Sequence, residues 1–207
     1  MCGRFVITNP VAKTKSIVKK AIKVEDIENY NAHPAQNLPV IKKYSNGNTL
    51  ELLKWGIVPS WSKKKEFKPL INARLETIDE KKSFKKNIKL HRCVVVADGF
   101  YEWRRDIKEK KPFYFLRDDK KMMFIAGIFE NSQFCLITEE ASENVNEIHH
   151  RQPVILNEKN INDYLNLQID GSNFLKEANK PKLEFYEISK DVNNPTNNNI
   201  SLIKKIN

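Results

Sequence analysis

The chain has 207 residues, of which 40% are hydrophobic, a length that suits one well-buried domain rather than two. The 36 Lys and Arg residues outnumber the 26 Asp and Glu residues, and the resulting net charge of +10 favours a polyanionic partner, nucleic acid above all. No stretch approaches the ~20 apolar residues of a membrane helix, and the N-terminus lacks an apolar signal-peptide core. We therefore expect a soluble, cytoplasmic, monomeric protein that does not contact membranes.

The first half of the chain predicts mainly strands. A strand at 4–8 and a helix at about 11–22 open the domain. Asn46-Gly47 tolerates the positive φ angles of a tight turn, which predicts a hairpin between the strands on either side. The predicted elements that follow the helix are strands at 38–43 and 50–55, a polar helix near 76–88, and an apolar buried strand at 93–97.

The second half continues in the same way and defines the fold class. It predicts strands at 112–117, 123–130, 133–138 and 182–188, and helices at about 142–149, 158–167 and 171–178, with Ser142 as an N-cap. The Asn-rich tail from 191 to 207 is expected to be a loop or a partly disordered end. Many strands with short turns indicate a single α+β domain over residues 1–207, built on an antiparallel, barrel-like sheet with flanking helices.

The three cysteines lie at positions 2, 93 and 135, few and far apart, which argues against a disulfide framework. We expect Cys93 and Cys135 to be buried structural thiols. Cys2 is different, because Met1 before so small a residue is normally trimmed, leaving a thiol and a free α-amine on one residue. With pKa values of roughly 8.5 and 7.7–8.0, both groups are partly unprotonated near neutrality and together can capture an aldehyde as a thiazolidine. The alternative is an ordinary cysteine, and this segment alone does not decide between them.

Familiar catalytic motifs are absent from the sequence, which contains no nucleotide-binding glycine loop, Gly-x-Ser-x-Gly, His-Glu-x-x-His or Cys-x-x-Cys. We expect neither a metal nor a cofactor. Glu102 follows an apolar strand between two aromatic residues, where desolvation would suit it to proton transfer, or it is a surface residue of an alternating strand. Asn72 either orients a nucleophile or caps a turn. His149 and His150 end a predicted helix and are either exposed or able to shuttle protons.

Arginine is scarce, so Arg4, Arg74 and Arg151 are the best candidates for bidentate phosphate contacts. Four aromatic residues are either core or a stacking platform for single-stranded nucleic acid: Trp55, Trp61, Phe100 and Trp103.

In their order and spacing these segments resemble the SRAP family, the SOS response-associated peptidase domain proteins, over nearly the whole chain. The segments that carry the resemblance are Met1-Cys2-Gly3-Arg4-Phe5, Tyr30-Asn31 with Pro34, Trp55-Gly56-Ile57-Val58-Pro59-Ser60-Trp61, Asn72-Ala73-Arg74 with Glu76-Thr77, Asp98-Gly99-Phe100-Tyr101-Glu102-Trp103, Ala126-Gly127-Ile128, and His149-x-Arg151-x-Pro153.

The resemblance implies a DNA-repair enzyme that senses and processes abasic sites in single-stranded DNA and is nucleoid-associated when bound. Cys2 would form a Schiff base and then a thiazolidine with the ring-opened sugar, giving a covalent DNA–protein crosslink, with possible lyase-type and peptidase activity. It also implies a catalytic role for Asn72 in holding Cys2 and the sugar, and for Glu102 and His149 in moving protons. The DNA contacts it implies are Arg4, Asn31, Pro39, Trp61, Arg74 and Arg151.

The sequence departs from the family pattern at Gln152, Leu75 and His33, which puts local packing or DNA contacts in question. Two other functions stay open. An N-terminal cysteine beside Asn, Glu and His could attack amides as N-terminal-nucleophile hydrolases do. The chain could also bind single-stranded DNA without catalysis, in which case Cys2 would be incidental.

Overall fold

The computed structural model describes residues 2–62, 67–104 and 110–206. Within them the strands form two sheets, one in the order β14-β9-β8-β1-β3 and a larger one in the order β12-β11-β10-β7-β4-β5-β2, with β6 and β13 attached to β11 and β10. The strands are β1 (Phe5–Thr8), β2 (Lys20–Ile22), β3 (Glu28–Ala32), β4 (Asn37–Tyr44), β5 (Gly47–Trp55), β6 (Asn72–Arg74), β7 (Arg92–Ala97), β8 (Gly99–Arg104), β9 (Lys111–Arg117), β10 (Met123–Glu130), β11 (Gln133–Glu140), β12 (Arg151–Pro153), β13 (Ile155–Leu156) and β14 (Leu183–Glu187).

The larger sheet curls until β11 reaches β5 through two parallel residue pairs, Gln133 with Lys54 and Phe134 with Trp55. This contact makes the sheet barrel-like, as predicted, but it does not make a closed barrel. Most pairings are antiparallel, and the short β2–β5, β11–β5 and β11–β6 pairings are parallel. The α+β class is confirmed.

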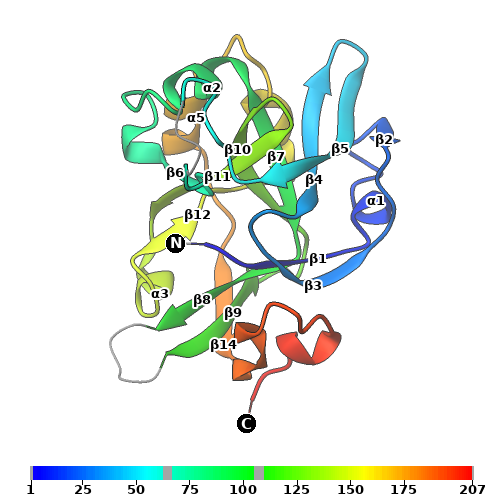
Figure 1. Cartoon of the computed structure of the whole chain (residues 1–207), viewed down its shortest axis with the longest axis vertical. Coiled ribbons are helices and arrows are strands. Elements are labelled where there is room, and N and C mark those ends of the chain that lie inside the picture. The colour runs from blue at the N-terminus through cyan, green and yellow to red at the C-terminus, as the bar shows by residue number, and fades with distance from the viewer. Residues whose placement is uncertain (1, 63–66, 105–109, 207) are drawn as a thin grey trace.

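Helices are short and lie around the sheets (Figure 1). They are α1 (Pro10–Lys13), α2 (Lys85–Leu90), α3 (Glu143–Asn146), α4 (Ile161–Tyr164) and α5 (Gly171–Glu177), with 3-10 turns η1 (Leu75–Thr77), η2 (Glu158–Asn160), η3 (Lys190–Asn193) and η4 (Ile200–Ile203). No helix in the described part of the chain is long and apolar enough to cross a membrane.

The predicted hairpin and the predicted buried strand at 93–97 are confirmed. The β4–β5 turn uses Gly47 at φ 120°, a conformation that favours glycine, and β7 is buried throughout. Ser142 does precede α3, but its side chain makes no capping hydrogen bond to the helix.

The long helix predictions at 11–22 and 76–88 are wrong. Helix α1 ends at Lys13, and Lys20–Ile22 instead pairs with β5 at the sheet edge. Residues 76–88 contain only η1, turns and the start of α2. In both stretches tertiary pairing and packing override a helical pattern, which is a weak determinant on its own.

The N-terminal strand β1 lies between β8 and β3, with Phe5 opposite Phe100 on one side and Ala32 on the other. This central place fixes the residues just before β1, and Figure 1 shows the N-terminus lying between β12 above and β8 below. The sequence did not predict β3, whose Glu and Asn residues have low strand propensity.

The C-terminal tail packs against the smaller sheet, β14-β9-β8-β1-β3, instead of extending away from it. Val192 and Leu202 are almost completely buried in a small core with Val6, Tyr30 and Tyr101. The tail is therefore part of the fold, and only its predicted irregularity is borne out.

Candidate functional site

Cys2 is completely buried three residues before the start of β1. Its thiol lies 3.8 Å from the Arg4 carbonyl oxygen, and its own carbonyl accepts a hydrogen bond of 2.9 Å from Asn72 Nδ2. Burial raises the pKa of the Cys2 thiol well above its usual range, and the negative charge of Glu102 raises it further. The thiol is thus neutral at physiological pH, and nucleophilic attack requires a group that takes its proton.

Asn72 reaches Cys2 because β6 pairs with β11 in parallel, placing Asn72 opposite Leu136. The neighbouring Ala73 is buried, so alternation along the strand turns Asn72 and Arg74 to the other face. The Asn72 Oδ1 atom is buried and has no hydrogen-bond partner among the described residues. An acceptor oxygen without a partner beside the nucleophile is suited to accept a hydrogen bond from a hydroxyl or amine of a bound reactant.

Glu102 and His149 face each other in the same interior. Strand β8 turns Phe100 and Glu102 toward the main core, while Tyr101 packs in the small core on the opposite face. Glu102 Oε2 lies 3.9 Å from His149 Nε2, and these side chains are 3% and 1% exposed. The surface alternative for Glu102 is therefore wrong: two titratable groups lie together out of contact with bulk water, an arrangement suited to proton transfer.

The His149 ring is oriented by its own chain. The Arg151 peptide N–H donates to His149 Nδ1 at 3.0 Å, and the Arg151 carbonyl lies 3.1 Å from the same nitrogen. In a neutral ring an Nδ1 that accepts a hydrogen bond is unprotonated, which leaves the ring proton on Nε2, facing Glu102. The exposed His150 ring stacks on His149 with centroids 4.6 Å apart.

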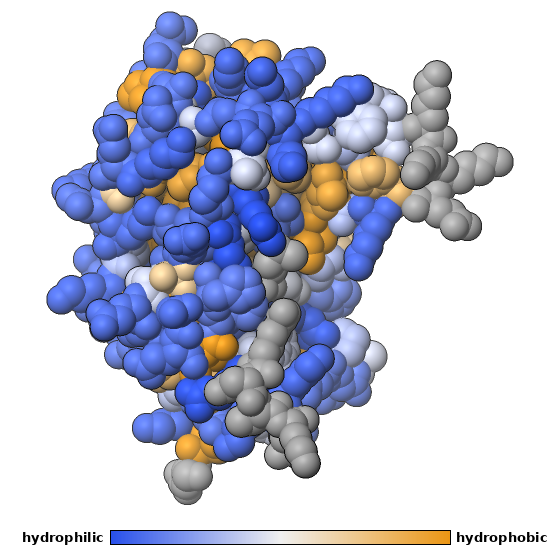
Figure 2. All heavy atoms as spheres, turned by 90° about the vertical axis from the view of Figure 1, so that its left-hand side faces the viewer, coloured by the Kyte–Doolittle hydropathy of each residue, from blue (hydrophilic) through white to orange (hydrophobic). Residues whose placement is uncertain are grey.

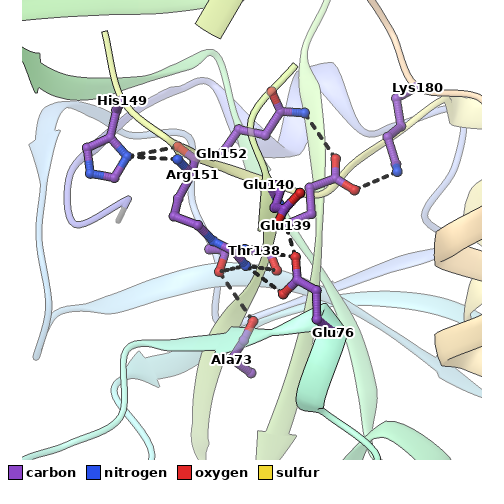
Figure 3. Close-up of polar contacts among 9 residues, drawn as sticks. All are labelled: Ala73, Glu76, Thr138, Glu139, Glu140, His149, Arg151, Gln152 and Lys180. Carbon is purple, nitrogen blue, oxygen red and sulfur yellow. Dashed lines mark hydrogen bonds and ion pairs between the residues drawn. The ribbon is translucent and has the colours of Figure 1, made fainter. Parts of the chain in front are cut away.

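The Arg151 side chain is buried in an ion pair with Glu76 (Figure 3). Its two terminal nitrogens lie 2.8 and 2.9 Å from the two Glu76 oxygens, and one of them also donates to the Thr138 carbonyl at 2.8 Å. Although burial alone would raise it, the Arg151 hydrogen bond holds the pKa of Glu76 below its usual range. The predicted phosphate contact by Arg151 therefore competes with a carboxylate already in place.

Arg74 and Trp61 are exposed, as a DNA-contacting role requires. Arg74 and Arg151 line a hollow of about 360 Å³ together with Glu140, Asn146 and His150. The face that carries β12 and α3 is covered mainly by hydrophilic residues (Figure 2). Trp61 is 45% exposed, and the Lys82 ammonium lies 4.8 Å from its ring centroid.

The other three predicted DNA contacts lie elsewhere in the fold. Arg4 donates to Asn31 at 2.7 Å and to the Val192 carbonyl at 2.8 Å. Asn31 is 1% exposed and donates to three carbonyls of the tail, including that of Asn197 at 2.9 Å. Pro39 is buried in β4 opposite Leu52. In this conformation the side chains of Arg4 and Asn31 are hydrogen-bonded to the C-terminal tail, and the buried Pro39 is not available to contact a DNA strand.

The three residues that depart from the family pattern, Gln152, Leu75 and His33, each find local contacts in the structure. Gln152 donates to Glu139 at 3.0 Å, and Lys180 pairs with the other Glu139 oxygen (Figure 3). Leu75 fills part of the core at 4% exposure. His33 is half-buried, with its Nε2 3.1 Å from Gln36. None of these contacts alters the arrangement at Cys2.

The remaining sequence predictions concern the core and metals. Trp55 and Phe100 are core residues, whereas Trp103 is half-buried and donates from its indole to Asn193 at 2.7 Å. Cys93 and Cys135 are buried free thiols, as predicted. Within the described residues no cluster of three or more His, Cys, Asp or Glu side chains is arranged to hold a metal ion.

Sequence reasoning did not assign a role to Glu76, Thr138 or the tail. Glu76 was visible only as part of a motif, and its partner Arg151 is separated from it by 75 residues. Nothing local in the sequence indicates which arginine a given carboxylate meets.

The fold and site define an α+β protein with a buried cysteine, flanked by an asparagine and by a glutamate–histidine pair. The family model described as SOS response associated peptidase (SRAP) matches residues 1–195, and the chain belongs to this family. It is similar to the abasic site processing protein YoqW of Bacillus subtilis, with 33% identity covering 99% of each chain, and to YedK of Escherichia coli, with 28% identity covering 100% of each.

The relationship extends to an animal protein and to solved structures. The abasic site processing protein HMCES of Pongo abelii is 28% identical over 82% of this chain and 62% of its own length. A crystal structure of a Bacteroides thetaiotaomicron protein superposes with a TM-score of 0.84 at 23% identity, covering 99% of this chain and 100% of that one. This last likeness establishes the shared fold.

Proposed function

We propose that this protein is an intracellular enzyme that processes abasic sites in single-stranded DNA by forming a covalent crosslink through Cys2, and so protects or repairs the damaged strand. The observation that carries the proposal is a completely buried Cys2 that is hydrogen-bonded to Asn72 and lies in the electrostatic field of Glu102, which in turn faces His149. Relatives at 28–33% identity are named abasic site processing proteins, which supports the same substrate here.

The proposed reaction starts with hydrolysis of the Met1–Cys2 peptide bond, which frees the α-amine of Cys2. Met1 itself lies outside the described residues. The amine attacks the C1′ aldehyde of the ring-opened sugar and one water leaves, giving a Schiff base. The thiol sulfur then adds to the C=N carbon while its proton passes to the nitrogen, and the five-membered thiazolidine closes.

Each buried side chain has a defined task in this sequence. Asn72 holds the Cys2 carbonyl and offers its Oδ1 to the sugar or the amine. Glu102 and His149 carry protons from the thiol and to the departing water, a task that their separation of 3.9 Å and their lack of exposure support. Because burial keeps the thiol neutral, its proton has to be removed in the closing step and not before it.

The DNA strand is proposed to run past the hollow beside β12, where Arg74 contacts phosphate and the exposed Trp61 stacks on a base. The net charge of +10 and the hydrophilic face support this path. Arg151 lines the same hollow but is neutralised by Glu76, so it contributes less to phosphate binding than Arg74 does.

The decisive experiment is a denaturing gel of the Met1-processed protein mixed with single-stranded DNA that carries one abasic site. The proposal predicts a shifted band that requires both the abasic site and Cys2, with Cys2→Ala and an undamaged strand as controls. Mass spectrometry of the shifted species should give the mass of protein plus DNA less one water. A folded, processed protein that gives no band would overturn the crosslinking mechanism and would direct attention to amide substrates.

A further inference from the structure

The orientation of His149 depends on the peptide of Arg151. The Arg151 N–H lies 3.0 Å from His149 Nδ1, close enough to make this nitrogen an acceptor and to leave Nε2 as the donor toward Glu102. The Arg151 carbonyl lies 3.1 Å from the same nitrogen, so a backbone shift that breaks the N–H contact leaves this carbonyl as the partner of Nδ1 and moves the ring proton from Nε2 to Nδ1. The tautomer at the site is therefore set by the position of one backbone segment.

That segment is anchored by the side chain of its own arginine. Arg151 is 5% exposed, and both of its terminal nitrogens are bonded to Glu76, with Thr138 accepting a further bond. Glu76 is itself held, because one of its oxygens accepts the Glu140 peptide N–H at 3.1 Å. Figure 3 shows the two groups of contacts meeting at Arg151, with the His149 ring bonded to the Arg151 backbone on one side and the guanidinium bonded to Glu76 on the other.

The chemistry of the pair makes the carboxylate specific. A bidentate guanidinium–carboxylate pair fixes both direction and distance, which a neutral amide cannot do, because an amide offers only one acceptor oxygen. The Glu76 side chain is 42% exposed, so water can solvate the pocket that its removal leaves and the core beneath remains packed. The expected consequence of losing the charge is a looser Arg151 and not an unfolded chain.

We propose that Glu76 is a positioning residue for the crosslinking reaction: it holds Arg151, whose peptide in turn fixes the ring orientation and tautomer of His149. This inference rests on the proposed function and assigns Glu76 a task in it. It also assigns Arg151 to the support of His149, with phosphate binding left mainly to Arg74.

The first test is the rate of crosslinking at saturating abasic-site DNA. Glu76→Gln should slow this rate on the order of 100-fold, as a small misplacement of a catalytic group does, and should change its pH profile in the range where histidine titrates. Removing the carboxylate that neutralises Arg151 beside the hollow should raise, and not lower, the affinity for an undamaged strand, so a slower rate at saturating DNA reports the reaction and not the binding. Glu76→Asp, which keeps the charge, should recover part of the rate.

A matched control is Glu139→Gln, which makes the same change of charge on the neighbouring strand. The Glu139 side chain bonds to Lys180 and Gln152, and within the described residues no hydrogen bond or ion pair joins it to Arg151. This variant should crosslink at the wild-type rate with the wild-type pH profile. A wild-type rate and profile for Glu76→Gln, or an unchanged rate with a DNA affinity altered more than tenfold, would overturn the positioning role.

The second test needs no DNA and separates this inference from the proposed function. Nitrogen-15 NMR of the ring in the free protein should show His149 Nδ1 unprotonated in the wild type and in Glu139→Gln, and a mixed tautomer in Glu76→Gln. If the tautomer changes as expected while the wild type forms no crosslink, the proposed reaction fails and the positioning of His149 stands. If the ring signals of Glu76→Gln and the wild type coincide, the inference itself is refuted.

Discussion

Replacing Glu102 with glutamine changes two properties of the site in opposite directions. The variant keeps the side-chain volume but removes a proton carrier, and it also removes the negative charge that raises the pKa of the Cys2 thiol. Relief from that charge favours the thiolate, and each pKa unit is worth about 1.36 kcal/mol. Burial is the larger cause of the raised pKa and is unchanged in the variant, so the thiol stays neutral and still requires a base.

The loss of proton transfer should therefore dominate. General acid–base catalysis contributes about 10²- to 10⁴-fold, or about 3–5 kcal/mol of activation free energy, and with Glu102 and His149 at 3% and 1% exposure bulk water cannot take over the task. We expect the Glu102→Gln protein to crosslink about 10²- to 10⁴-fold more slowly than the wild type. The assay measures the single-turnover rate of crosslinking: samples are quenched at successive times and the crosslinked fraction is measured on a denaturing gel.

The control for this experiment is Glu187→Gln, which has the same change of charge in β14, where Glu187 pairs with Lys111 at 3.0 Å. It should react like the wild type. A Glu102→Gln protein that is folded, binds the strand and reacts at or above the wild-type rate would show that thiolate formation limits the reaction, and the proton-transfer role would be withdrawn.

Three further outcomes are expected. An uncleaved extension before Cys2 should abolish crosslinking while undamaged DNA still binds, and a normal yield on the gel would contradict the need for the amine. Arg74→Ala should weaken binding to all strands alike and reduce the slope of log affinity against log salt by about 1, measured by fluorescence anisotropy, whereas an unchanged slope would remove Arg74 from the phosphate contacts. Burial raises the pKa of Cys93 in the folded protein, so its contribution to stability is complete below the unfolded pKa of ~8.5 and is lost at about 1.36 kcal/mol per pH unit above it. Cys93→Ala should therefore flatten the alkaline loss of stability in urea titrations, and curves of equal steepness would contradict this linkage.

The strands were more predictable than the helices, for a physical reason. Alternation and apolar runs mark β7, β10 and β11 because a buried sheet face requires them, and Asn46-Gly47 marks its turn through backbone sterics. The stretch at 11–22 looks helical by spacing alone, but its last residues find partners in β5, which the sequence does not reveal.

The site divides in a similar way. Cys2, Asn72, Glu102 and His149 could be selected as candidates because they stand within distinctive segments that resemble one family, and their catalytic roles stay a prediction; the burial of Cys2 was not predicted. The partner of each arginine could not be predicted: Arg4 bonds to the tail and Arg151 to Glu76, across separations of 188 and 75 residues. The sequence does not show whether an arginine binds a phosphate or an oxygen of the protein itself, and only the folded structure distinguishes the two.

The hydrogen bond between Arg4 and Val192 joins the first strand made during synthesis to nearly the last segment. At about 5–20 residues per second the ribosome needs roughly 10 to 40 s to supply that partner, and until then β1 lacks its complete setting. An aminopeptidase working on the nascent chain meets residues 1 and 2 in the open during this interval. Once β1 is enclosed, Cys2 has 0% exposure. Removal of the residue before Cys2 during this interval therefore precedes the enclosure of the proposed nucleophile.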